Sequence, residues 1–145
     1  MQFFITEKAW KEMLMYLKKV YPEEGCGVLF GIIDCNFLAK KVYPMKNVWA
    51  NTRERKNRYA LSPIEWLKAE KEAENEGLSI IGIFHSHPNY PSVPSPFDIE
   101  RAWEGYIYLI VEIFQGKAKK AGAYVFNTCK EFRSLGIEII KEDAP

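Results

Sequence analysis

Apolar residues recur at helical spacing in two stretches of the chain. The first stretch follows Thr6, a typical N-cap residue, and its apolar positions repeat every three or four residues until Pro22. The second follows Ser62 and Pro63, a pair typical of a helix start, and should end near Gly77. The sequence therefore predicts two amphipathic helices, one in each stretch.

Shorter apolar runs predict β-strands. Residues 26–33 and 37–43 are separated by a short turn-like segment, which predicts a hairpin, whereas residues 44–58 have no clear period and predict a long connection. Residues 78–85 form an apolar run typical of a central strand. Further along we expect a short helix over 96–104 and strands over 106–114, 121–127 and 133–140. These elements predict an α/β (α+β) fold, with a mixed, mostly antiparallel sheet flanked by helices in three layers.

The bulk composition predicts one domain over residues 1–145. With 48% apolar residues, the chain can bury a core without cross-links. A formal net charge of +1 gives no overall attraction to nucleic acid or to an anionic membrane. The three cysteines are too few and too scattered for a disulfide scaffold, and we find neither a signal peptide nor an apolar stretch of membrane-spanning length. We therefore expect a soluble, cytoplasmic protein.

The two histidines of the chain lie at the end of the predicted central strand. His85 and His87 are two residues apart, so in an extended backbone both imidazoles point to one side and can reach the same ion. Asp98 follows in the first turn of the next helix, and the Pro-rich loop between can fold back to present its carboxylate. Two histidines and one carboxylate leave a position for water, as in catalytic zinc sites.

Each of these residues also has an ordinary explanation. Histidines at this spacing are often incidental, and Ser95 with Asp98 forms a helix-capping pattern. Capping is compatible with catalysis, because a helix N-terminus places donors where a developing oxyanion can use them. Cys26 lies among apolar residues at a strand start and is interpreted as a packing residue. The HExxH signature is absent, and a (β/α)₈ barrel typically needs about 250 residues, more than this chain has.

The segment from residue 85 to residue 98 resembles the motif of JAMM (MPN-plus) metalloproteases. It begins with His-Ser-His-Pro, and Ser95 stands at the eighth position after His87, with Asp98 three positions further on. The spacing does not depart from the family pattern.

An upstream element also resembles that family. Glu24 stands two residues before the pair Cys26-Gly27, which is the register of the catalytic glutamate in the family's N-terminal element. Glu23, its neighbour, is interpreted as a solvated charge. The resemblance runs from the first predicted helix to about Trp103 and is closest to the prokaryotic stand-alone, deubiquitinase-like type.

The resemblance implies a JAMM-type sheet with flanking helices, one zinc ion per chain, and hydrolysis of the amide bond after the C-terminal glycine of ubiquitin-like modifier proteins. The substrate would be the extended Gly-Gly tail of the modifier, and we expect residues 44–58 and 89–94 to cover it. The site residues that the resemblance implies are the zinc ligands His85, His87 and Asp98, the general base Glu24, which activates the zinc-held water, and the oxyanion donor Ser95.

Three other functions are compatible with the sequence. A peptidase that processes a ubiquitin-like sulfur-carrier protein would use the same chemistry. A non-catalytic MPN scaffold is a different class, although such relatives usually lack the metal ligands that are all present here. Nucleic-acid binding is raised only by a basic run, and a solvated or substrate-facing loop explains that run better. The run consists of Arg53, Arg55, Lys56 and Arg58.

Overall fold

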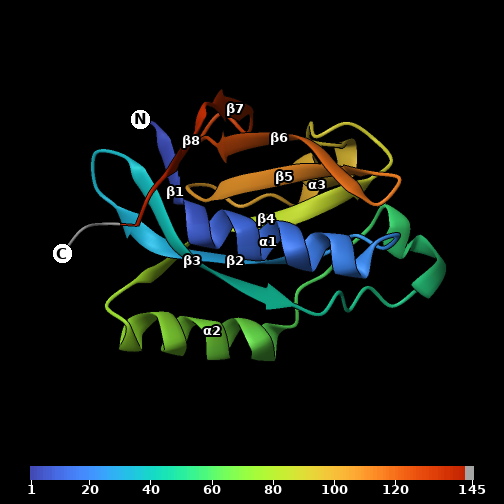
Figure 1. Ribbon diagram of the computed structural model, residues 1–145, viewed down its shortest axis with the longest axis horizontal. Helices are drawn as coiled ribbons and strands as arrows, with labels where there is room; N and C mark the ends of the chain where they lie inside the picture. The colour runs from blue at the N-terminus through green and yellow to red at the C-terminus, as the bar shows by residue number, and fades with distance from the viewer. Residues whose placement is uncertain (143–145) are drawn as a thin grey trace.

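The two predicted amphipathic helices cover opposite faces of one sheet (Figure 1). Helix α1 (Glu7–Val20) begins after the N-cap Thr6, and helix α2 (Pro63–Asn75) begins after the N-cap Ser62, as predicted. Along strand β2 (Cys26–Ile33), Leu29 packs in the core on the α1 side. Its neighbours Val28 and Phe30 pack in the core on the α2 side, because successive strand residues point to opposite faces.

The sheet contains all the strands of the chain that the structure describes. A computed structural model describes residues 1–142, and within them eight strands follow the order β7-β6-β5-β4-β2-β3-β1-β8. Strand β2 is antiparallel to both of its neighbours, whereas β4 and β5 are parallel. The remaining strands are β1 (Phe3–Thr6), β3 (Phe37–Met45), β4 (Ser79–Pro88), β5 (Ile107–Phe114), β6 (Lys117–Phe126), β7 (Phe132–Leu135) and β8 (Ile137–Ile140). The three-layer arrangement around a mixed sheet confirms the predicted fold class.

The C-terminal part of the sheet differs from the prediction. The single strand expected over 133–140 is wrong, because the chain divides at Gly136. Strand β7 pairs with β6, and β8 pairs with β1 at the opposite edge of the sheet. Strand β1 itself was not predicted, since its four residues are too few to show an alternating pattern.

Other details also differ from the sequence prediction, and β3 and β4 both extend a few residues beyond their predicted ends. Helix α3 (Pro96–Arg101) ends three residues earlier than expected, and a 3₁₀ helix, η1 (Thr52–Lys56), lies within the long connection. Strand β6 begins at Lys117 because Gln115 and Gly116, both with positive φ, make a tight turn after β5. Among residues 1–142, no helix combines the length and the apolar character that a membrane span requires.

Gly27 occupies a position with no room for a side chain. It lies on β2 between β3 and β4, and a Cβ built there would approach Tyr43 O to 2.4 Å and the Phe84 ring to 2.5 Å. We expect Gly27→Ala to lower the free energy of unfolding by about 1–3 kcal/mol through overpacking, measured by urea denaturation. Gly136→Ala is the matched control, because no heavy atom of the described residues lies within 4 Å of a Cβ there. Equal urea midpoints for the two variants would contradict this steric account.

Candidate metal centre

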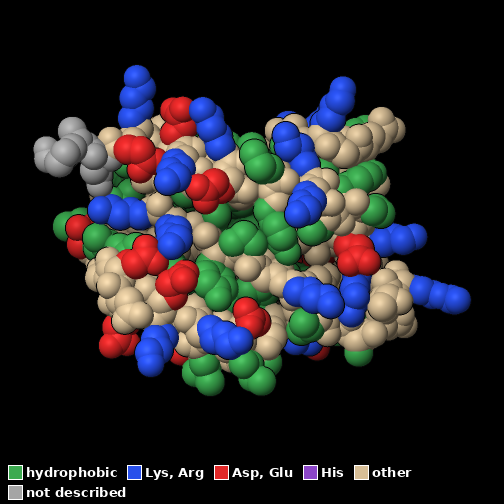
Figure 2. All heavy atoms as spheres, turned by 60° about the horizontal axis from the view of Figure 1, so that its bottom comes forward, with side chains coloured by type: hydrophobic (Ala, Val, Ile, Leu, Met, Phe, Trp, Pro, Cys, Tyr) green, Lys and Arg blue, Asp and Glu red, His purple; other side chains and the backbone are tan. Residues whose placement is uncertain are grey.

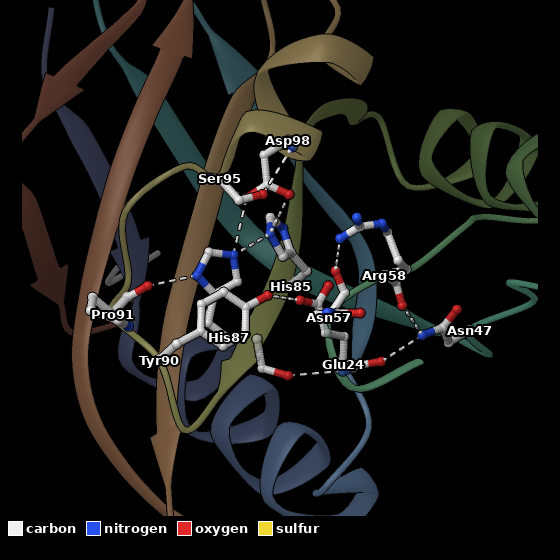
Figure 3. A network of polar contacts seen from close by, with 12 residues as sticks. Glu24, Asn47, Asn57, Arg58, His85, His87, Tyr90, Pro91, Ser95 and Asp98 are labelled. Carbon is white, nitrogen blue, oxygen red and sulfur yellow. Dashed lines mark hydrogen bonds and ion pairs between the residues drawn. The ribbon is translucent and has the colours of Figure 1, made fainter. Parts of the chain in front are cut away.

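Three buried side chains converge at the end of β4. His85 and His87 lie two residues apart on this strand, and their Nε2 atoms are 3.2 Å from each other. The carboxylate of Asp98, from α3, places Oδ2 3.0 Å from His87 Nε2 and Oδ1 3.3 Å from His85 Nε2 (Figure 3). One ligand atom from each residue lies within 4.8 Å of the others, so the group could hold a metal ion. The structure thus brings together the three residues that the sequence predicts as ligands.

Helix capping fixes the carboxylate of Asp98. Asp98 Oδ2 accepts a hydrogen bond from Ser95 N–H at 2.9 Å, and Ser95 Oγ accepts one from Asp98 N–H at 3.1 Å. These two bonds form a capping box, and Pro96 at the first helical position adds a second helix-start feature, as predicted. The hydroxyl of Ser95 accepts one hydrogen bond in this arrangement and keeps its O–H for a further donation. Capping and metal binding therefore use the same two residues.

The orientation of His87 fits a metal ligand. Its Nδ1 lies 2.6 Å from the carbonyl oxygen of Pro91, an atom that can only accept, so Nδ1 carries the hydrogen. With the hydrogen on Nδ1, the nitrogen that can bind a metal is Nε2, which faces His85 and Asp98. A hydrogen bond of this kind at the non-ligating nitrogen is the usual support of a metal-binding histidine.

The protonation states of the group also fit a cation. Burial lowers the pKa of His85, which favours the neutral imidazole. Burial alone would raise the pKa of Asp98, but the two histidines and the Ser95 N–H hold that pKa well below its usual range. A neutral imidazole and an ionised carboxylate are the forms that bind metal. Within residues 1–142, His85 Nδ1 is buried without a hydrogen-bond partner, and the Tyr59 ring stacks on the imidazole at 4.5 Å.

Glu24 lies beside the histidines because the pairing of β2 with β4 continues past the end of β2. Gly25 N–H donates to Ser86 Oγ at 2.8 Å, and Ser86 N–H donates to Gly25 O at 3.0 Å. With Gly25 opposite Ser86, this register puts Glu24 opposite His87 on the same face of the sheet. The local backbone therefore brings the predicted general base to the predicted metal ligands.

The environment of Glu24 favours a proton carrier. The residue is 2% exposed, and burial raises the pKa of its carboxyl to about 8. The negative charge of Asp98 raises the pKa of Glu24 further. Two contacts lower it: the hydrogen bond that the Tyr90 hydroxyl donates to Glu24 Oε2, and the positive charge of Arg58. A carboxyl that titrates near neutrality can both accept and return a proton.

Two further residues shape the site and were missed in the sequence. The Tyr90 ring stacks on the His87 ring with 4.1 Å between centroids, while its hydroxyl contacts Glu24. Asn47 Nδ2 donates to the carbonyl oxygens of Glu24, at 3.1 Å, and of Arg58, at 2.9 Å. The contacts of both residues with Glu24 join positions far apart in the chain, so no local spacing could have revealed them.

A cavity of about 140 Å³ adjoins Asp98. Its walls are mainly aromatic and aliphatic and include Tyr59, Phe97 and Trp103, with Arg101 also contributing. The metal-binding group therefore lies next to a small apolar recess that could receive part of a substrate.

The sequence matches a family model described as prokaryotic homologs of the JAB domain, Prok-JAB, over residues 6–126. The chain belongs to the Prok-JAB family. The matched residues include all five predicted site positions, from Glu24 to Asp98. The recognition made from the JAMM motif is thereby confirmed.

Two curated relatives of this Prok-JAB chain carry functional names. A desampylase from Haloferax volcanii is 41% identical over 90 residues, which cover 61% of this chain and 62% of that protein. A probable TtuB-protein conjugate cleaving protease from Thermus thermophilus is 37% identical over 99 residues, which cover 68% of this chain and 62% of that protein. The chain thus spans less than two thirds of the length of either relative.

Solved structures resemble this Prok-JAB chain over nearly its whole length. A solution structure of a protein from Desulfitobacterium hafniense has a TM-score of 0.81 at 26% identity and covers 97% of this chain and 96% of that one. A crystal structure of a JAB1/MPN domain protein from Archaeoglobus fulgidus has a TM-score of 0.58 at 17% identity and covers 97% and 100%. The latter likeness shows that the fold is that of JAB1/MPN domains.

Proposed function

We propose that this Prok-JAB chain is a zinc-dependent isopeptidase that cleaves the amide bond after the C-terminal glycine of ubiquitin-like modifier proteins. The observation that carries the proposal is the buried convergence of His85, His87 and Asp98, with Glu24 opposite His87. The names of the two relatives, a desampylase and a probable conjugate cleaving protease, support the same substrate class.

Zinc is the metal that this donor set favours. Two imidazole nitrogens and one carboxylate oxygen are common zinc ligands, and three protein ligands leave a fourth position open. When bound, zinc would supply Lewis-acid chemistry and would lower the pKa of water in the site to about 7. The buried setting supports one ion per chain.

The chain's own residues divide the proton transfer and the charge stabilisation. Glu24, whose pKa is raised to about 8, accepts a proton from the attacking water and returns it to the leaving amine. The Ser95 hydroxyl, which keeps its O–H free to donate, stabilises the negative charge that develops on the carbonyl oxygen. The bonds from Asn47 and Tyr90 keep the Glu24 backbone and carboxylate in position.

The two segments that we assign to cover the modifier tail both contact the site. Arg55, in the 44–58 segment, accepts a hydrogen bond at its carbonyl oxygen from Glu24 N–H at 2.6 Å. Tyr90, in the 89–94 segment, stacks on His87. A tail held between these two segments would bind in an extended form, and a Gly-Gly sequence suits such a site because it has no side chains to accommodate.

The proposed substrate can be tested against the closest alternative, a peptidase that processes a sulfur-carrier protein. The zinc-loaded protein is incubated with a modifier joined to lysine through its C-terminal glycine, and separately with a carrier that has a C-terminal extension. We expect cleavage of the first substrate at the isopeptide bond. If only the extended carrier is cleaved, the isopeptidase proposal is wrong and the carrier-processing peptidase takes its place. If neither substrate is cleaved, both proposals are wrong.

Ser95→Ala should lower kcat by about 10²–10³-fold, because an oxyanion donor is lost. The same change removes the N-cap of α3 and costs about 1 kcal/mol of stability. Ser62→Ala separates these effects, since Ser62 caps α2 through a 3.3 Å bond from Glu65 N–H and lies outside the site. Steady-state kinetics and thermal unfolding of both variants check the prediction. A similar kcat for the two variants would leave Ser95 with a capping role only.

A further inference from the structure

Three arginines lie near Phe97 and Trp49, next to the metal site: two of them over the aromatic rings and the third against the Trp49 backbone. The Arg58 guanidinium lies 4.4 Å from the centroid of the Phe97 ring, and that of Arg101 lies 5.1 Å from the same centroid. Arg101 also lies 5.4 Å from the Trp49 ring, and Arg55 Nε donates to Trp49 O at 2.8 Å. We refer to Arg55, Arg58 and Arg101 as the arginine cluster.

The arginine cluster lies in a wider basic region. Arg53 and Lys56, both exposed, belong to the same segment of the chain. In Figure 2, Lys and Arg side chains are spread over the face shown, and Asp and Glu side chains are fewer toward the right-hand end, where the segment that contains η1 lies in Figure 1. The net charge of the whole chain is only +1, so this is a local feature.

Among residues 1–142, none of the three guanidinium groups of the cluster forms a direct ion pair with a carboxylate, and the charge of Arg58 reaches Glu24 only at longer range. Elsewhere on the surface, Lys41 Nζ lies 2.9 Å from Glu76 and Lys68 Nζ lies 3.4 Å from Glu65. Aromatic rings hold two of the arginines in place but do not neutralise them. An anion that binds here would therefore meet guanidinium groups that are already oriented and whose positive charge is not neutralised by an ion pair.

The cluster adjoins the metal-binding group and the cavity beside it. Phe97, the ring under Arg58 and Arg101, immediately precedes the metal ligand Asp98, and Arg101 lines the cavity beside that ligand. The charge of Arg58 also acts on Glu24, whose pKa it lowers, and Glu24 N–H donates to Arg55 O. The cluster is therefore placed beside the metal-binding group, where the residues that precede a cleaved bond could contact it.

We propose that the arginine cluster binds an acidic segment that immediately precedes the Gly-Gly tail of the modifier, and that it selects modifiers carrying such a segment. The inference rests on the proposed isopeptidase function and names the substrate class more narrowly. Guanidinium groups form bidentate, charge-assisted hydrogen bonds with carboxylates. A protein segment is favoured over nucleic acid because the cations surround one ring next to the catalytic group instead of forming an extended basic stripe.

Two synthetic isopeptides test this proposal. Both end in Gly-Gly joined to the side chain of a lysine, and the four residues before Gly-Gly are all Glu in one and all Gln in the other. We expect the wild-type zinc-loaded protein to cleave the Glu peptide with about tenfold higher kcat/KM at low salt, and the preference to fall in 0.5 M NaCl as the charges are screened. The double variant Arg58→Gln/Arg101→Gln should bring the ratio of kcat/KM for the two peptides close to one, whatever its absolute rate on either peptide.

Lys68→Gln/Lys71→Gln on α2 is the matched control, because it removes two positive charges away from the site and should keep the preference. Equal cleavage of the two peptides by the wild type would overturn the inference and leave the proposed function intact. Cleavage of neither peptide would count against the proposed function itself. Inhibition of Gln-peptide cleavage by a 20-nucleotide single-stranded DNA in the wild type, but not in the double arginine variant, would assign the cluster to nucleic acid and also overturn the inference.

Discussion

Glu24→Gln should lower kcat by about 10²–10⁴-fold while the protein keeps its zinc, because the loss of a general base typically costs that much. Glutamine retains the size of the side chain and can still accept the hydrogen bond from Tyr90, but it cannot take a proton from water. Glu24 is opposite His87 and is not one of the three convergent ligands, so metal binding should survive. Steady-state kinetics and zinc content of the purified variant measure both effects.

Glu23→Gln provides the control for this experiment. Glu23 adjoins Glu24 in the chain but is half-buried at the surface, and its N–H bonds back to Val20 O at 3.0 Å. We expect its kcat to stay within about twofold of the wild type, as is usual for substitutions outside a site. Wild-type turnover by Glu24→Gln, or an equal loss in Glu23→Gln, would remove Glu24 from its proposed role.

His87→Ala should lose both the metal and the activity. The imidazole contributes one of three convergent donors, and its removal leaves His85 and Asp98 with too few ligands for a stable site. Loss of the metal removes a Lewis acid that stabilises the transition state by several kcal/mol. We therefore expect kcat/KM to fall by about 10³-fold or more. Zinc content by atomic absorption and kcat/KM on the isopeptide substrate measure the two effects.

Chelator-stripped wild-type protein is the reference for His87→Ala. It should show the same low rate and should recover when zinc is returned, whereas the variant should not recover. Because His87 is fully buried, thermal unfolding of the metal-free forms must accompany the assay, with His87→Gln as a variant closer in volume. A folded His87→Ala or His87→Gln protein with full zinc-dependent activity would exclude His87 as a ligand.

Local signals in the sequence predicted most of the fold. The N-caps Thr6 and Ser62 and the apolar periodicity placed α1 and α2 within a few residues of their observed bounds. Local signals could not predict which strands pair at the edges of the sheet. Strand β8 pairs with β1, from the other end of the chain, and no pattern within either strand encodes that partner.

The same distinction explains what could be predicted of the site. His85, His87 and Asp98 were found because strand spacing and a capping box constrain where such side chains point, and the structure brings them together. Asn47 and Tyr90 were missed because their contacts depend on how two loops fold over β4. The zinc ion and the catalytic roles of Glu24 and Ser95 remain predictions.

The rate of isopeptide cleavage as a function of the zinc-to-protein ratio tests the central claim most directly. Chelator-stripped protein is titrated with zinc while the release of free modifier, ending in its C-terminal glycine, is followed by intact mass spectrometry. A hydrolytic site built on His85, His87 and Asp98 predicts a rate that rises with added zinc and reaches a plateau at one ion per chain. Full activity in the stripped protein, or no cleavage when one zinc ion is bound, would contradict it.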